Sequence, residues 1–267
     1  MARHGDGGKV SGMMRRPVIM GAVFFAVFSL AGCASLASYN PATERREYIF
    51  IPTATEVQMG RDVHAKLKAA YNVDEDSDQA RRLTEIGRRV AAVSDRQDYT
   101  YHFYLIKNKE LNAFTTPGGY IYVFSGLMDK LQTDDQIAAV LGHEVGHCAA
   151  RHAIKKFQGV MAYNVIGGLV FNQLGLEGTG QEILSMTSSQ VISLIFSAYS
   201  RKDEYEADRL GLKYTSAGGY DPRGLRESLR IIETASSPDR IPLFLRTHPY
   251  LHDRIKVIDE WIAGRRD

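Results

Sequence analysis

Apolar side chains recur at helical spacing along much of this chain. The first such segment, residues 55–71, predicts a helix with Thr55 as its N-cap. A second helix is predicted over residues 78–93. Its apolar stripe consists of Leu83, Ile86, Val90 and Val93. Both helices are therefore expected to pack one face against a core.

Two later segments have the composition of strands instead. Residues 99–107 are rich in aromatic and β-branched side chains and predict a strand. Residues 111–126 predict a second strand, a turn at the Pro-Gly-Gly sequence and a third strand. Together these segments predict a small antiparallel sheet beside the helices.

Helical spacing returns after the strands. Thr133 and Gln136 have the spacing of a capping box, which predicts a helix start there. The apolar stripe of this helix consists of Ile137, Val140, Leu141 and Val145. Three further helices are predicted over residues 200–217, 221–235 and 248–264. The whole pattern predicts an α+β fold that is mainly helical.

Residues 159–199 are mostly apolar, rich in glycine, serine and methionine, and almost free of charge. One interpretation is a pair of buried helices joined by a flexible loop at residues 175–180. The other is a mobile lid, or a segment facing a membrane, above the functional site. The sequence leaves both interpretations open.

Charge narrows the possible partners. The formal net charge is +2, and four basic side chains against one acidic side chain give residues 1–32 a charge of +3. This leaves about −1 for the remaining chain, and no clustered basic face is evident there. The composition therefore predicts no nucleic-acid partner.

The N-terminus has the pattern of an export signal. Arg15 and Arg16 precede an apolar stretch over residues 18–30, which suits a signal peptide better than a membrane span. The sequence Leu30–Cys33 that follows resembles the bacterial lipobox. Residues 1–32 are therefore predicted to be a lipoprotein signal peptide.

The lipobox resemblance implies a lipid on Cys33 that anchors the mature chain. Ala34, the residue after it, resembles the sorting signal for the outer membrane. Residues 33–54 are then a lipid anchor and tether, and residues 55–267 form the folded domain. Cys148 is the other cysteine, so a lipid on Cys33 leaves no disulfide pair.

The chemistry centres on the sequence His-Glu-x-x-His at positions 143–147. Two histidines four residues apart share one face of a helix, so His143 and His147 can bind one metal ion. Glu144 lies about 100° around the helix and is placed to take a proton from a water on that metal. The motif therefore predicts a catalytic zinc site.

A catalytic zinc needs a third protein ligand and one open position. His152 does not match the spacing of a known third histidine, because positions 150 and 153 are both alanine. It is expected to interact with the carbonyls at the helix end instead.

The better third ligand is Glu204. Glu204 and Asp208 are four residues apart on a predicted helix, so one carboxylate can bind the metal and the other can orient a ligand histidine. Three other glutamates compete for the ligand role. Glu177 and Glu182 lack a second carboxylate at this spacing, and Glu206 lies on a different helix face.

Three motifs in this order resemble the HtpX and CAAX-prenyl-protease type of metallopeptidase, metallopeptidase family 48. They are "GHEVGHCAARH", "SRKDEYEADRLG" and "THPYLHDRI", and the "LNAFTTPGGYIYV" stretch also matches. The resemblance implies a gluzincin-type domain and is strongest to small periplasmic lipoprotein members without membrane spans. It implies one zinc ion per chain held by His143, His147 and Glu204. It also implies Glu144 as base and Asp208 beside the site.

Further residues are expected to serve catalysis and substrate binding. His248 can donate to the developing oxyanion or can occupy the open zinc position and keep the site latent. The alternative to both catalytic roles is that His248 only caps a helix. Arg254 is expected to orient His248 or the ligand glutamate and to be one of the substrate-binding residues. The last expectation concerns an edge strand that takes up the substrate as an added strand, through Asn112, Ala113 and Phe114.

These features predict a zinc endopeptidase, anchored to a bacterial envelope and facing the periplasm. Its expected substrates are misfolded or unassembled envelope proteins. The alternative is a chaperone or assembly factor whose zinc site is normally plugged.

Overall fold

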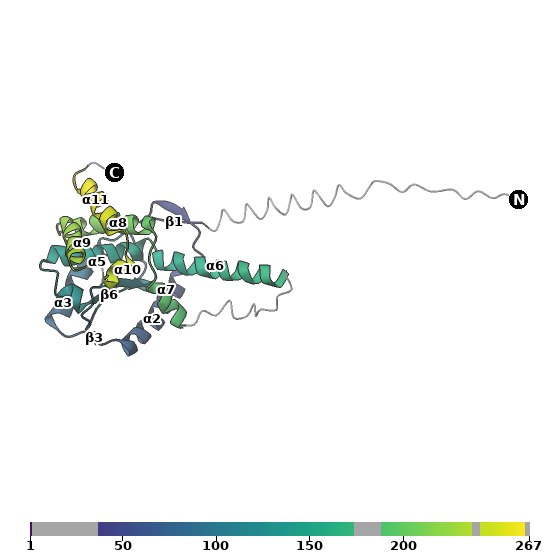
Figure 1. Ribbon diagram of the computed structural model, residues 1–267, viewed down its shortest axis with the longest axis horizontal. Helices are drawn as coiled ribbons and strands as arrows, with labels where there is room; N and C mark the ends of the chain where they lie inside the picture. The colour runs from purple at the N-terminus through teal and green to yellow at the C-terminus, as the bar shows by residue number, and fades with distance from the viewer. Residues whose placement is uncertain (2–36, 174–187, 237–240, 265–267) are drawn as a thin grey trace.

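The structure is a computed structural model that describes Met1 and residues 37–173, 188–236 and 241–264. The rest of the predicted signal peptide, Cys33 and the loop at residues 175–180 lie outside the described residues. The elements are, in chain order, β1 (Ser38–Asn40), β2 (Arg45–Glu47), α2 (Thr53–Ala70), β3 (Val73–Asp74), α3 (Asp78–Ala92), β4 (His102–Ile106), β5 (Ala113–Thr116), η1 (Pro117–Gly119), β6 (Tyr120–Phe124), α4 (Ser125–Met128), α5 (Asp134–Ala149), α6 (His152–Gln173), α7 (Ser188–Ile195), α8 (Arg201–Ala217), α9 (Arg223–Thr234), α10 (Leu243–Thr247) and α11 (Leu251–Ile262) (Figure 1). The mainly helical α+β fold is confirmed.

The central sheet has the strand order β3-β4-β6-β5. The predicted strand, Pro-Gly-Gly turn and strand are present as β5, η1 and β6, which pair antiparallel. β6 lies between β5 and β4 and runs parallel to β4. The expected antiparallel pairs are thus present, and the one parallel pair arises because the β5–β6 hairpin places β6 beside β4.

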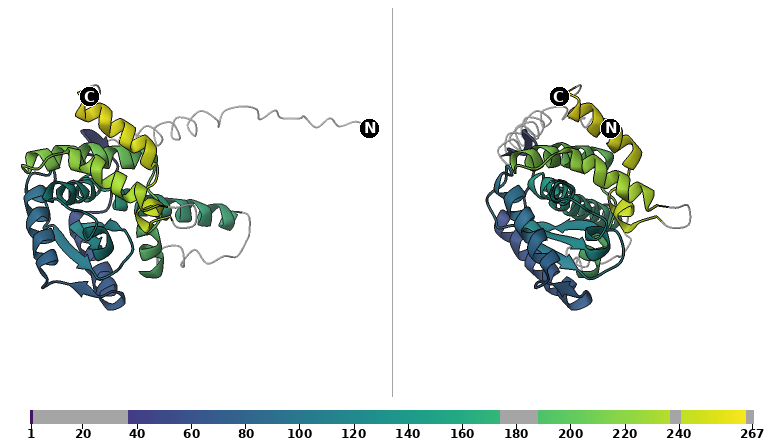
Figure 2. Two further views of the ribbon diagram at one scale, coloured as in Figure 1. Left: turned by 60° about the vertical axis from the view of Figure 1, so that its left-hand side comes forward. Right: turned by 90° about the vertical axis from the view of Figure 1, so that its left-hand side faces the viewer.

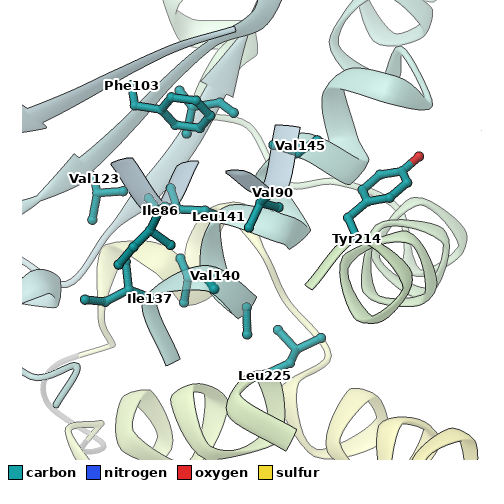
Figure 3. Close-up of a cluster of buried hydrophobic side chains, with 14 of the residues drawn as sticks. Ile86, Val90, Phe103, Val123, Ile137, Val140, Leu141, Val145, Tyr214 and Leu225 are labelled. Atoms are coloured by element: carbon teal, nitrogen blue, oxygen red, sulfur yellow. The ribbon is translucent and has the colours of Figure 1, made fainter. Parts of the chain in front are cut away.

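Alternating side chains give the sheet two buried faces. One face, with Phe103 and Val123, packs against α3 and α5, and the same core continues beyond α5 to α8 and α9 (Figure 3). The opposite face, with Tyr122 and Phe124, packs against Val63 of α2. Every residue of β5 and β6 is buried, and the continuous apolar run of β6 is typical of a strand covered on both faces.

Helix α5 lies in the middle of the molecule. Its residues from Gln136 to Ala149 are all buried. It packs against α8 and α9 on one side and against α3 and β5 on the other (Figure 2). Because α5 is surrounded on all sides, its side chains are buried on every face of the helix.

The predicted helix starts are only partly correct. α2 begins at Thr53 after Pro52, and the Thr55 cap is wrong because Thr55 already lies inside the helix. At α5 the Thr133 hydroxyl accepts from the Gln136 N–H as expected, at 3.2 Å. The Gln136 side chain accepts instead from the Gln132 N–H, so one half of the capping box forms. The last helix begins at Leu251 rather than at His248.

The two helices predicted within residues 159–199 are present as parts of α6 and α7. Ile154 and Gln158 anchor the start of α6 in the body, whereas Tyr163 is 78% exposed. Figure 1 shows the rest of α6 extending away from the body. The interpretation as buried core therefore fails at Tyr163. None of the described helices is both long and apolar enough to cross a bilayer.

The residues before α2 form a hairpin that packs against the helices. β1 and β2 form a hairpin in which Asn40 is buried and donates to the Ala149 carbonyl at the end of α5, at 3.3 Å. Lys155 of α6 pairs with Glu47 at 2.6 Å. Arg209 of α8 donates to the Ala42 carbonyl at 3.1 Å. The hairpin thus contacts α5, which carries the His-Glu-x-x-His sequence, and the neighbouring helices α6 and α8.

Candidate active site

Glycines bring α5 and α8 unusually close together. A Cβ atom at Gly146 would lie 2.8 Å from the Ala207 carbonyl oxygen, and one at Gly211 would lie 2.9 Å from the His143 backbone nitrogen. Only glycine leaves room for this approach. As a result the two carboxylates of α8 reach the two histidines of α5.

The side chains of His143, His147, Glu204 and His248 converge on one buried point. The Nε2 atoms of His143 and His147 are 3.1 Å apart, and His248 Nδ1 lies 3.2 Å from His143 Nε2. Glu204 Oε1 lies 3.5 Å from His147 Nε2 and 3.1 Å from His248 Nδ1. Two donors on one tetrahedral zinc lie about 3.3–3.4 Å apart, from bonds of about 2.0–2.1 Å. The donor set therefore fits a zinc ion.

The electrostatics of these donors also suit a cation. Burial lowers the pKa of His147 well below its usual value, which keeps the imidazole neutral as a metal ligand must be. Burial alone would raise the pKa of Glu204, but the Arg254 guanidinium and His248 hold it well below its usual range. A neutral imidazole and an ionised carboxylate are the ligand forms that zinc requires.

Asp208 and Arg254 fix the first of the histidines. His143 Nδ1 lies 2.9 Å from Asp208 Oδ1, which leaves its Nε2 lone pair facing the metal position. Arg254 is fully buried, donates two hydrogen bonds to Asp208 and forms an ion pair with Glu204 at 2.6 Å. This pairing fits the expected role of orienting the ligand glutamate rather than direct contact with substrate.

Glu144 is buried, and its carboxylate holds no other described side chain in place by a hydrogen bond. Neither of its oxygens has a hydrogen-bond partner among the described residues, and burial raises its pKa. His248 Nε2 lies 3.5 Å from Glu144 Oε1. A carboxylate without a hydrogen bond is costly to bury, so the oxygens of Glu144 are suited to bind a polar molecule such as water beside the metal position.

His248 faces both carboxylates. It follows α10, and its ring is fully buried between Glu204 and Glu144. Burial alone would lower the pKa of His248, but these two carboxylates raise it. The ring stacks on Phe244 with centroids 4.6 Å apart. A histidine held in this way does more than cap a helix.

The expected substrate strand is at the edge of the sheet. β5 is the outermost strand next to β6, and Asn112, Ala113 and Phe114 are buried at its start. Neither side-chain polar atom of Asn112 has a hydrogen-bond partner among the described residues. The Phe114 ring contacts Phe196 beyond α7, with centroids 4.8 Å apart.

Sequence reasoning missed two side chains that hold His147. Tyr199 stacks on the His147 ring with centroids 4.1 Å apart. We expected His152 to interact with the carbonyls at the helix end, and this prediction is wrong. Its Nδ1 lies 2.8 Å from His147 Nδ1 instead. The turn that brings His152 back toward the site lies at Arg151, whose φ is 58°, and no local sequence pattern signals this turn. Glu177 and Glu182, the competing ligands, lie outside the described residues.

Comparison with known proteins decides the family. The profile of Peptidase family M48 matches residues 77–262, which include every side chain of the converging group. The chain belongs to peptidase family M48. Its members are metal dependent, and the M48 domain of this chain carries a His-His-Glu-His group.

Several characterised relatives are similar to this M48 chain. Mitochondrial metalloendopeptidase OMA1 of Schizosaccharomyces pombe is 28% identical over 84% of this chain and 66% of its own length. Beta-barrel assembly-enhancing protease of Escherichia coli is 27% identical over 75% of this chain and 42% of its own length. Metalloprotease LoiP of Escherichia coli is 33% identical over 70% of this chain and 72% of its own length. The match thus covers about two fifths of one of these relatives and about two thirds of the other two.

Proposed function

We propose that this chain is a zinc metalloendopeptidase with one zinc ion held by His143, His147 and Glu204. The observation that carries the proposal is the buried Glu144 carboxylate, which has no hydrogen-bond partner among the described residues and lies beside the converging donors. A merely structural zinc site has no need for a free base. The names of the relatives, two proteases and a metalloendopeptidase, support the same activity.

Each residue of the site has a separate role in peptide hydrolysis. A zinc ion supplies Lewis acidity, which makes water acidic near neutral pH and polarises the scissile carbonyl. Glu144 accepts the proton of the attacking water, since its raised pKa makes it a better base, and then passes it to the leaving amine. His248 is placed to donate to the developing oxyanion. Asp208 and Arg254 hold His143 and Glu204 in position.

The substrate is an unfolded or misassembled envelope polypeptide. It adds to the edge of the sheet at β5, beside Asn112, Ala113 and Phe114, through main-chain hydrogen bonds that tolerate different sequences. The enzyme is anchored by lipid on Cys33 to the bacterial outer membrane and faces the periplasm. The relative named for β-barrel assembly supports this site of action.

Glu144→Gln tests the proposal in the full-length protein purified in detergent. The expected result is zinc near one per chain in parent and variant, and a loss of cleavage of an unfolded protein by about 10²–10⁴-fold in the variant. A chelator should abolish cleavage by the parent. Absence of zinc from the parent, or equal cleavage by the variant, would contradict the proposal.

A second candidate function is a chaperone or assembly factor with a latent site. His248 Nδ1 lies at hydrogen-bonding distance from both His143 Nε2 and Glu204 Oε1, at 3.2 Å and 3.1 Å. In this function His248 occupies the fourth corner of the donor set and excludes water, and these distances support that role. The His248→Ala variant separates the two roles. Higher cleavage than in the parent indicates a plugged site, and lower cleavage indicates an oxyanion donor.

A further inference from the structure

A chain of contacts leads from His147 to the N-terminal hairpin. His147 Nδ1 lies 2.8 Å from His152 Nδ1, and His152 Nε2 lies 3.1 Å from Glu206 Oε2. The other Glu206 oxygen pairs with the guanidinium of Arg45 in β2. His152 is 1% exposed and Glu206 is 11% exposed, so the two inner links are shielded from water. These four residues come from α5, α6, α8 and β2.

The contacts fix the proton positions along this chain. His147 presents Nε2 to the metal position, so its remaining proton is on Nδ1 and is donated to His152. His152 then accepts at Nδ1 and must carry its own proton on Nε2, which it donates to the Glu206 carboxylate. Arg45 neutralises the same carboxylate from the far side. Each link has one donor and one acceptor, and none is left unpaired.

The arrangement mirrors the one around the other ligand histidine. His143 Nδ1 is held by Asp208, which is itself held by Arg254 of α11. For His147 a second histidine is interposed before the carboxylate and the arginine. The contacts of each ligand imidazole thus lead to a carboxylate that is paired with an arginine. The arginine is Arg254 for His143 and Arg45 for His147.

We infer that His152 is a positioning residue for His147, and that Glu206 and Arg45 act through it by holding its acceptor nitrogen toward the ligand. This inference rests on the proposed zinc site and adds a part of the N-terminal hairpin to the catalytic domain. Partners that orient ligand histidines commonly change metal affinity by about 10–100-fold. Removing such a partner changes the geometry of the metal ligands as well as the reaction rate. Removing a contact that only stabilises the fold does not change the metal geometry.

The first experiment compares His152→Ala with His152→Asn in the full-length protein in detergent. Asparagine keeps an acceptor oxygen close to the position of imidazole Nδ1. Zinc affinity is measured by competition with a chelator, and the visible spectrum is recorded after cobalt substitution. The alanine variant should bind zinc about 10–100-fold more weakly, with a shifted cobalt spectrum and a lower kcat at similar KM. The asparagine variant should recover most of the affinity and the parent spectrum.

The second experiment tests the outer links. Glu206→Ala should weaken zinc binding in the parent but should add nothing in the His152→Asn background, where no imidazole tautomer remains to be fixed. Arg45→Ala should have an effect of at most about fivefold, because its side chain is 46% exposed. Arg209→Ala is the matched control, since it removes another contact between the hairpin and α8, the hydrogen bond to the Ala42 carbonyl, and takes no part in these contacts.

The outcomes separate this inference from the proposed function. A parent without zinc overturns both. A parent that binds zinc and cleaves, with His152→Ala equal to it in zinc affinity and cobalt spectrum, overturns the positioning role alone. An effect of Arg209→Ala as large as that of Arg45→Ala would assign the loss to hairpin docking and would overturn the role of Arg45.

Discussion

Arg254 donates two hydrogen bonds to Asp208, at 2.8 Å from Nε to Oδ2 and at 2.7 Å from Nη2 to Oδ1. Its third nitrogen pairs with Glu204, so one buried cation serves two buried carboxylates. Burial alone would raise the pKa of Asp208, but Arg254 lowers it and keeps the carboxylate ionised. Without this cation the interior would hold two acidic groups with no compensating charge from α11.

Arg254→Ala is therefore expected to destabilise the protein strongly. Removing one partner of a buried ion pair costs about 3–5 kcal/mol, because the other charge stays buried and unpaired. Urea unfolding of the zinc-free protein measures this loss. Arg201→Ala is the control, since the pair of Arg201 with Asp253 is 53% and 45% exposed and should contribute at most about 1 kcal/mol. Equal losses in the two variants would refute the buried-pair interpretation.

Gly146→Ala should separate α5 from α8. The added methyl group would meet the Ala207 carbonyl at 2.8 Å and Leu210 Cβ at 3.2 Å, and overpacking of this kind costs about 1–3 kcal/mol. Zinc affinity should fall with stability, because Glu204 moves away with its helix. Gly159→Ala is the matched control in α6, where an added Cβ would meet no atom within 4 Å apart from its own helix backbone and chain neighbours, and it should stabilise by about 0.5–1 kcal/mol. Thermal melts and chelator competition on both variants provide the measurements.

Zinc removal should lower the unfolding temperature in a concentration-dependent way. A ligand that binds the native state alone at 100 times its Kd adds about 2.7 kcal/mol. Calorimetry of the chelator-treated protein at increasing free zinc should therefore show a rising transition temperature. The double variant His143→Ala with His147→Ala should show no such rise. A rise in the double variant would place the stabilising zinc elsewhere.

Lys156 should make stability increase with pH between 7 and 9. Burial lowers its pKa to about 8, against the opposing effect of Asp203 and Glu204. The unfolded chain keeps this proton up to about pH 10.4, so the native state releases it first and gains stability as pH rises through 8. Relative to Lys156→Met, the parent should gain about 1 kcal/mol between pH 7 and 9. A constant difference across this range would show that Lys156 keeps its usual pKa.

Local spacing was enough to predict the side chains that share one helix. His143 and His147, and likewise Glu204 and Asp208, are four residues apart, and helix geometry then fixes which face they occupy. The sequence also predicted the β5–β6 hairpin, since the Pro-Gly-Gly turn is a local signal. Fold class followed from the same short-range patterns.

Contacts between distant segments were not predictable in the same way. The pairing of Arg45 with Glu206 joins residues 161 positions apart, and no local pattern distinguishes either side chain from an ordinary surface charge. His152 was assigned to the helix end because the turn at Arg151 depends on one backbone angle rather than on side-chain spacing. Helix starts were also misjudged, as at Thr53, where Pro52 begins the helix without a side-chain cap.

The late position of His248 and Arg254 in the chain has a consequence for biosynthesis. A ribosome that has already made both histidines of α5 has still to add about a hundred residues before Arg254 appears, as the contact of Arg254 with His143 spans 111 positions. Until then Asp208 and Glu204 lack their counter-charge, and the hydrolytic centre stays unassembled. The charge balance of the buried site is thus completed only when α11 has been made, so the carboxylates of α8 are held in place only after synthesis has reached the C-terminal part of the chain.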